Sequence, residues 1–145
     1  MNHPMLVAVA LAVCATSVLA HSGVKNPAVM ARMHGMTLIS DNVKVLGTMA
    51  KGQVAFDAAS ARAAAQAIAD HAAQSVDLFA ADETDPKSEA LPAIWTDFDD
   101  FTIKAEALET AAADLAASVQ SLEDVRAAMP KIGATCKACH SKYRE

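Results

Sequence analysis

The sequence predicts an all-α protein, built as an antiparallel, up-and-down four-helix bundle. Of its 145 residues, 53% are hydrophobic, only 4% are aromatic and about 34 are alanine. Alanine is the strongest helix former, whereas strands favour β-branched and aromatic residues, so the composition favours helices. Four long stretches repeat apolar residues at helical spacing, and most links between them are short. Short links between helices of about 25 residues make neighbouring helices antiparallel.

The first two helices are predicted over about Pro27 to Lys51 and about Asp57 to Ala81. Pro27 suits a first helical turn, Gly52 suits a stop and Asp57 suits an N-cap. The apolar series of the first helix steps by seven residues through Val29, Met36, Val43 and Ala50. The inward series of the second comprises Ala61, Ala65, Ile68, Ala72, Val76 and Phe79.

The third helix is predicted to start near Pro92 and has the most regular pattern. Its apolar positions are Phe98, Phe101, Ala105, Leu108, Ala112, Leu115 and Val119. An acidic link from Asp82 to Leu91, which contains Pro86, precedes it and is the one long loop expected.

The fourth helix is predicted to begin at Ser121, which can form a capping box with Asp124. It continues through Leu122, Val125, Met129, Ile132, Cys136, Cys139 and Tyr143. Proline removes a helical hydrogen bond and clashes with the preceding turn. We therefore expect a kink or short break near Met129, with the helix restarting at Pro130.

The N-terminus is typical of a secretory signal peptide. Residues 5–15 form an apolar run, and the segment that follows has small or moderate residues at its last and third-last places, Ala20 and Val18. The alternative is a membrane anchor, but the run is short for a span of about 20 residues. The sequence therefore predicts a signal peptide over residues 1–20 and a mature domain over residues 21–145, exported to the periplasm and not spanning a membrane. Cys14 leaves with the signal, so the mature chain keeps Cys136 and Cys139.

Charge and motif content exclude several function classes. The net charge of −5 argues against nucleic acid as the partner. The sequence holds no glycine-rich phosphate loop and no arrangement of Ser, His and Asp that indicates an enzyme. His34 and His71 fall off the apolar stripes of their helices and are expected at the surface.

The segment Cys136-Lys137-Ala138-Cys139-His140 is a Cys-x-x-Cys-His motif, which in an exported protein attaches c-type haem. Positions three apart on a helical turn share a face, so both thiols can add to the two vinyl groups on one porphyrin edge. His140 then presents an imidazole nitrogen to the iron. The sequence therefore predicts one covalent haem c with its iron.

Three alternatives to haem use the same residues. A thioredoxin-like redox pair starts a helix after a strand, whereas this motif ends an all-helical chain. Zinc needs four ligands, and the motif supplies two cysteines and one histidine. A disulfide between cysteines so close in sequence would stabilise little and would give His140 no role.

A four-helix bundle with this motif in its last helix resembles the class II c-type cytochromes, which are cytochrome c′ and its low-spin relatives of the cytochrome c-556 kind. The resemblance covers residues 27–145. It rests on the haem motif with Tyr143-Arg144 after it, on Lys51-Gly52-Gln53, on Pro92-Ala93-Ile94-Trp95, and on Arg32-x-x-x-Met36.

The resemblance assigns roles to three further residues. Arg32 is placed inward by its heptad position, and a buried guanidinium needs an anion. The resemblance implies a haem propionate, whereas the alternatives are a carboxylate or an exposed position at the bundle end. Met36 would lie over the distal haem face, where a methionine binds the iron in the low-spin relatives. Met33, one position off the stripe, is the weaker candidate. Arg144 would lie beside the proximal histidine.

The predicted function is electron transfer, with iron held between His140 and Met36 and cycling between ferric and ferrous states. The alternative is a five-coordinate cytochrome c′ that binds small gases such as nitric oxide or carbon monoxide. The resemblance also allows a homodimer through the first two helices. Phe79, Trp95, Phe98 and Phe101 are expected either beside the haem or in ordinary core packing. The basic residues around the motif form either a solvated face or a docking patch for an acidic redox partner; they are Lys131, Lys137, Lys142 and Arg144.

Overall fold

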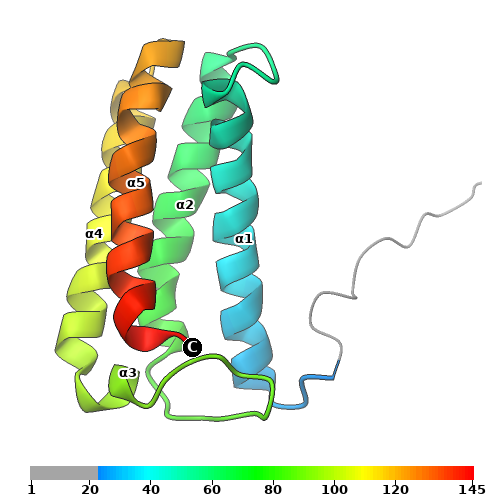
Figure 1. Cartoon of the computed structure of the whole chain (residues 1–145), viewed down its shortest axis with the longest axis vertical. Helices are drawn as coiled ribbons and strands as arrows, with labels where there is room; N and C mark the ends of the chain where they lie inside the picture. Colours follow the sequence, from blue (N-terminus) through cyan, green and yellow to red (C-terminus); the bar gives the residue numbers. More distant parts are fainter. Residues whose placement is uncertain (1–22) are drawn as a thin grey trace, which may run out of the picture.

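The computed structural model describes residues 23–145, which form four long helices and one short helix (Figure 1). The helices are α1 (Pro27–Ala50), α2 (Ala58–Leu78), α3 (Ala93–Thr96), α4 (Phe98–Ser118) and α5 (Leu122–Tyr143). The four long helices lie side by side, and consecutive ones run in opposite directions. The predicted four-helix bundle is confirmed. The predicted signal peptide over residues 1–20 lies outside the described residues.

Small residues let the helices of the bundle approach closely. The most extensive packing joins α2 to α4 and α1 to α2, whereas α1 and α5 pack much less against each other. A Cβ atom on Gly35 would come 3.1 Å from the side chain of Leu78, so α1 and α2 nearly touch at that point. The interior contains the buried alanines Ala61, Ala64, Ala65, Ala69, Ala72 and Ala112. Larger side chains that are fully buried between them include Leu46, Ile68, Val125 and Ile132.

Most helix ends follow the predicted capping chemistry. The Asp57 side chain accepts from the Ser60 N–H, and Ser121 and Asp124 form the predicted capping box. Gly52 ends α1 with a φ of 69°, and its N–H donates to Met49 O. Because only glycine adopts this conformation without strain, Gly52 is the residue that lets the chain leave α1.

The second and third predicted helices are shorter than expected. The second was expected to reach Ala81, but α2 ends at Leu78. The third was expected to run unbroken from near Pro92, but it divides at Asp97, whose φ of −141° and ψ of 55° are not helical. The break has a tertiary cause, because the Asp97 carboxylate accepts from Lys142 Nζ at 2.6 Å and its carbonyl accepts from Tyr143 Oη at 3.3 Å.

The short break expected near Met129 was wrong, because α5 runs without interruption from Leu122 to Tyr143. The kink expected there as the alternative stays a prediction. Proline costs the helix one hydrogen bond at that turn. Val125 and Ile132, on either side of it, are fully buried on the same face of α5. Their packing keeps both halves of α5 on the bundle, which offsets the missing hydrogen bond.

The loop between α2 and α3 is fastened to both ends of the chain that the structure describes. Asp85 accepts the backbone N–H groups of Lys25, Asn26 and Lys87 at 2.8 to 3.0 Å. Further along, Ala90 forms an isolated antiparallel bridge with Arg144. The loop is thereby held across the end of the bundle where α5 terminates (Figure 1).

Candidate cofactor site

A cavity of about 520 Å³ lies between α1, α4 and α5 near the C-terminal end of α5. A volume of this size is within the usual range for cofactor pockets. Its lining includes, from α1, Val29, Arg32, Met33, Met36, Ile39 and Val43; from α4, Phe101, Lys104, Ala105 and Leu108; from α5, Cys136, Cys139, His140 and Tyr143; and, from the loop, Ser88, Glu89 and Ala90.

The two cysteines of the motif lie on this cavity, on one face of α5. Both are free thiols and half-buried. Burial raises the pKa of each thiol above its usual value. Cys136 packs against the alanine-rich core, and Cys139 packs against a second cluster that contains Phe79, Ile94, Phe101 and Tyr143. The two cysteines therefore line the cavity at the boundary between the two apolar clusters.

His140 follows on the same wall, and neighbouring groups cover about half of its surroundings. Burial lowers the pKa of its imidazole, and the charge of Arg144 lowers it further, while Glu89 acts in the opposite direction. The lowered pKa favours the neutral imidazole, which is the form that binds a metal.

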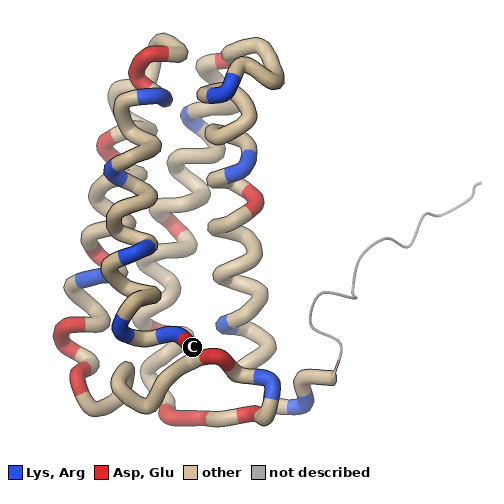
Figure 2. The backbone as a smooth tube through the Cα atoms, viewed as in Figure 1, with Lys and Arg blue, Asp and Glu red and all other residues tan. Residues whose placement is uncertain are grey.

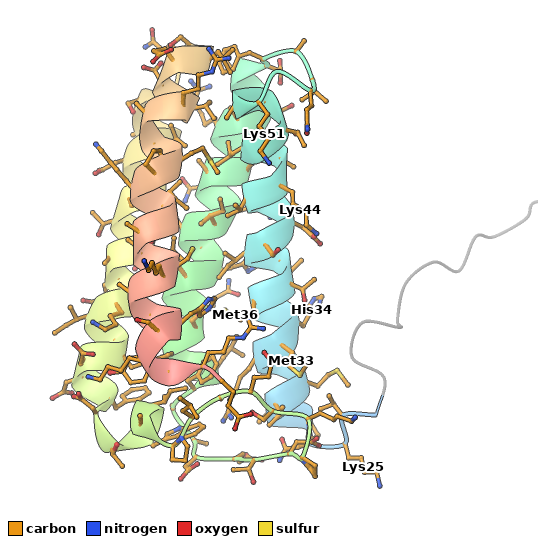
Figure 3. The ribbon with its side chains drawn as sticks, viewed as in Figure 1. Lys25, Met33, His34, Met36, Lys44 and Lys51 are labelled. Atoms are coloured by element: carbon orange, nitrogen blue, oxygen red, sulfur yellow. The ribbon has the colours of Figure 1, made fainter. Side chains whose placement is uncertain are left out.

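Met36 extends from α1 toward α5 and packs against both apolar clusters. Met33 also lines the cavity, whereas the exposed His34 lies on the outer side of α1 (Figure 3). The cavity therefore has the cysteines and histidine of α5 on one wall and two methionines of α1 on another. His71 is half-buried and contacts Gln74 at 3.3 Å, away from the cavity lining.

Arg32 is buried as predicted, with 2% of its surface exposed, and it lines the cavity. Its partners are three backbone carbonyls at and just after the end of α2. Nε donates to Leu78 O at 2.9 Å and Nη1 donates to Glu83 O at 2.7 Å, while Nη2 donates to Ala81 O. Arg32 thereby satisfies carbonyls that the end of α2 leaves without a partner in the helix. A guanidinium has five N–H donors, so two remain for another acceptor.

Aromatic side chains close one end of the cavity. Phe101 stands at the centre, with its ring 5.0 Å from that of Phe79, 5.7 Å from that of Phe98 and 5.5 Å from that of Tyr143. Of the four aromatics considered from the sequence, Phe79 and Phe101 line the cavity. Trp95 instead donates Nε1–H to Phe79 O at 2.8 Å, which fixes α3 beneath the cluster.

Two members of the basic cluster have acidic partners. Lys142 contacts Asp97 and Asp100 at 2.6 and 2.9 Å, and Arg144 forms an ion pair with Glu89. Figure 2 shows the alternation of basic and acidic residues around the end of α5. The predicted basic patch is therefore partly neutralised within the protein, and Lys131 and Lys137 are its exposed remainder.

Sequence reasoning missed Glu89 and the carbonyls that bind Arg32. Glu89 lies in the long loop, where no helical period indicates which side chains face inward. The only signal was its place in the acidic segment close to Pro92. Backbone carbonyls carry no sequence signal, because every residue has one.

The donor set fits covalent haem better than the alternatives. Two thiols and an imidazole line a cavity of cofactor size, and a thioether and a guanidinium lie on another wall. Within residues 23–145 no three His, Cys, Asp or Glu side chains lie close enough to hold a metal ion, which leaves zinc without a ligand set. The cysteines are not joined as a disulfide. Residues 136–140 end a helix of a helical bundle, which is unlike a thioredoxin site.

A helical bundle with a cavity lined by a Cys-x-x-Cys-His motif has the architecture of a c-type cytochrome. Comparison with known proteins agrees, since the family described as cytochrome C′ matches residues 27–144. The chain belongs to the cytochrome c′ family.

Two similar proteins are cytochrome c-554 of Cereibacter sphaeroides and cytochrome c-556 of Agrobacterium tumefaciens. The first is 41% identical over 119 residues, covering 77% of each chain. The second is 38% identical over 110 residues, covering 75% of this chain and 89% of the relative.

Solved structures show the same fold. A structural model of oxidised R. palustris cytochrome c556 has a TM-score of 0.75 and 26% identity, covering 83% of this chain and 98% of that one. A nitric oxide complex of a cytochrome c prime variant from Alcaligenes xylosoxidans has a TM-score of 0.72 and 32% identity, covering 81% and 94%.

The family carries haem c, bound covalently and containing iron, so the predicted cofactor is confirmed. Among residues 23–145, no helix combines the length and the apolarity needed to cross a membrane.

Proposed function

We propose that this protein is a periplasmic electron carrier in which His140 and Met36 would bind the haem iron. The observation that carries the proposal is the cavity itself, with the attachment motif on α5 and Met36 on the facing wall of α1. Haem supplies an iron that takes up and releases one electron. A thioether ligand is soft and favours ferrous iron, which raises the reduction potential.

The chain's own residues would hold the group on every side. Cys136 and Cys139 would hold the haem through thioether bonds, each formed by adding S–H across a vinyl group. His140 would bind the iron as a neutral imidazole. Arg32 keeps two N–H donors beyond its three carbonyl partners, and we assign these to a haem propionate.

The surroundings favour electron transfer over an enzymatic reaction. A peroxidase needs an acid–base pair over the distal face. His34 is exposed on the outer side of α1, and Arg32 is engaged by carbonyls. Neither residue is placed to move a proton at a substrate on the haem.

A second candidate is gas binding at a five-coordinate iron. The nitric oxide complex of the similar Alcaligenes xylosoxidans protein favours it. Here Met36 would shield the distal face without binding the iron. Redox proteins are the expected partners in the first case, and a homodimer through α1 and α2 is compatible with both candidates.

Optical spectra of the purified holoprotein in both oxidation states test the proposal. We expect low-spin spectra for the wild type and a high-spin spectrum for Met36→Ala. Met33→Ala is the matched control, since it removes a neighbouring methionine of the same cavity and should stay low-spin. A high-spin wild type would exclude Met36 as a ligand and favour gas binding. Absence of covalent haem after expression with the cytochrome c maturation system would exclude both candidates.

A further inference from the structure

The last residues of α5 are clasped by the loop that precedes α3. Leu91 N–H donates to Tyr143 O, and Glu145 N–H donates to Glu89 O, each at 3.0 Å. The side chains add an ion pair, in which Arg144 Nε donates to Glu89 Oε2 at 2.6 Å. Nη2 of Arg144 contacts the same oxygen. Backbone and side chains together fix where the Glu89 carboxylate lies.

This clasp lies directly beside His140. The Arg144 N–H donates to His140 O at 3.2 Å, so Arg144 is one helical turn further along α5. His140, Glu89 and Arg144 all line the same cavity. Arg144 therefore brings a positive charge, and Glu89 a negative charge, to the wall of the cavity that His140 lines.

We infer that Glu89 is a positioning residue for the redox centre: it holds Arg144 in place and offsets the positive charge that Arg144 brings to the iron-binding histidine. The inference rests on the proposed role of His140 as the iron ligand. Ferric haem carries one more positive charge than ferrous haem, so a nearby cation favours the ferrous state and a nearby anion favours the ferric state. Arg144 therefore raises the reduction potential, and Glu89 lowers it.

The ion pair is a weak candidate for a purely stabilising role. Both side chains are about half exposed, at 51% for Arg144 and 56% for Glu89. Exposed pairs contribute little to the free energy of unfolding. The backbone hydrogen bonds of residues 89, 91, 143 and 145 hold the loop without them. What the pair adds is a defined arrangement of two opposite charges at the edge of the cofactor cavity.

The experiment is a spectroelectrochemical titration of the holoprotein at pH 7 and low ionic strength, comparing Glu89→Gln with Arg144→Gln. At a fixed applied potential, the ferrous-to-ferric ratio should rise about two- to fivefold in Glu89→Gln and fall by a similar factor in Arg144→Gln. Both shifts should shrink in 1 M salt, because exposed charges are screened. Glu106→Gln, an exposed carboxylate on α4, is the control and should leave the ratio unchanged.

A double variant, Glu89→Arg with Arg144→Glu, restores the ion pair with its charges exchanged. We expect it to fold like the wild type and to have a lower reduction potential, since the negative charge now lies closer to His140. A wild-type potential in this variant, or shifts of the same direction in both single variants, would overturn the inference and leave a structural role for the pair. If a single variant fails to fold, Glu89→Asp, which keeps the charge, should restore the wild-type potential.

The measurements distinguish an error in the proposed iron ligand from an error in the role of Glu89. The potentials are compared only among proteins with covalent haem and wild-type spectra. A His140→Ala variant that keeps the wild-type spectrum would reject the ligand assignment itself. Unshifted potentials in variants with intact spectra would reject only the role of Glu89.

Discussion

The buried guanidinium of Arg32 lies over the ring of Phe79, with its central carbon 5.0 Å from the ring centre. It also lies 5.1 Å from the ring of Trp95, so the cation is bounded by two aromatic faces. With its three carbonyl partners, this places a fully desolvated charge at the point where α1, the end of α2 and α3 meet. Burial lowers the pKa of Arg32, but the nearby Glu83 and Asp82 act against that change.

Replacing Arg32 should destabilise the whole end of the bundle where the cavity lies. Arg32→Ala leaves the carbonyls of Leu78, Ala81 and Glu83 without their donor and removes both aromatic contacts. We expect a loss of about 2–4 kcal/mol in the free energy of unfolding, measured by urea denaturation. Arg32→Lys should lose less, because an ammonium keeps the charge but cannot match the planar fork of donors.

Arg62→Ala is the matched control for Arg32→Ala. Arg62 is exposed and donates to a single carbonyl, that of Val119, at 3.2 Å. Its removal should cost less than about 1 kcal/mol. Equal losses from the two variants would show that the carbonyl cluster around Arg32 contributes nothing beyond one surface hydrogen bond.

Asp85 should make the free energy of unfolding depend on pH in the acid range. Three backbone N–H groups, led by that of Lys25, hold the pKa of Asp85 below its ordinary value of 3.8. A carboxylate whose pKa is lower in the folded state stabilises the fold above its unfolded pKa. That contribution is lost as the pH falls below 3.8 through the folded value. Asp85→Asn should therefore show a flatter decline in the free energy of unfolding below about pH 4 than the wild type.

The control for Asp85→Asn is a variant that removes a surface charge without changing the loop between α2 and α3. Asp114→Asn on α4 is a suitable control, because the Asp114 side chain is exposed and lies far from this loop in the sequence. Unfolding curves measured at half-unit steps from pH 5 to pH 2.5 would give the slopes. If Asp85→Asn follows the same slope as the wild type, the loop is held by its other contacts and not by this carboxylate.

Replacing Pro130 in α5 should stabilise the protein. The helix continues through it, so alanine at this position would gain the missing N–H donor and relieve the clash with the preceding turn. We expect Pro130→Ala to raise the free energy of unfolding by about 1–3 kcal/mol, measured by urea denaturation with the haem spectrum as a second readout. A loss of stability would instead indicate that proline sets the path of α5 past α1.

Repeating patterns along the chain predicted the elements that depend on near neighbours in sequence. The spacing of apolar residues predicted all four long helices, and Asp57, Ser121 and Asp124 predicted two of the caps. The short break expected near Met129 was wrong, because proline chemistry is local whereas burial of Val125 and Ile132 depends on the partner helices. The unexpected break at Asp97 has the same origin, since Lys142 and Tyr143 reach it from the far end of the chain.

The sequence by itself determined the fold class and the cofactor, and it predicts Cys136, Cys139 and His140 as the residues that hold the cofactor, because helical period and the Cys-x-x-Cys-His spacing are properties of neighbouring residues. Only the tertiary structure decided what surrounds them. Arg32 meets carbonyls 46 to 51 residues away, and Arg144 meets Glu89 across 55 residues. Such contacts depend on the path of a loop that has no period of its own, and the loop takes that path only when the packed helices bring its anchors together.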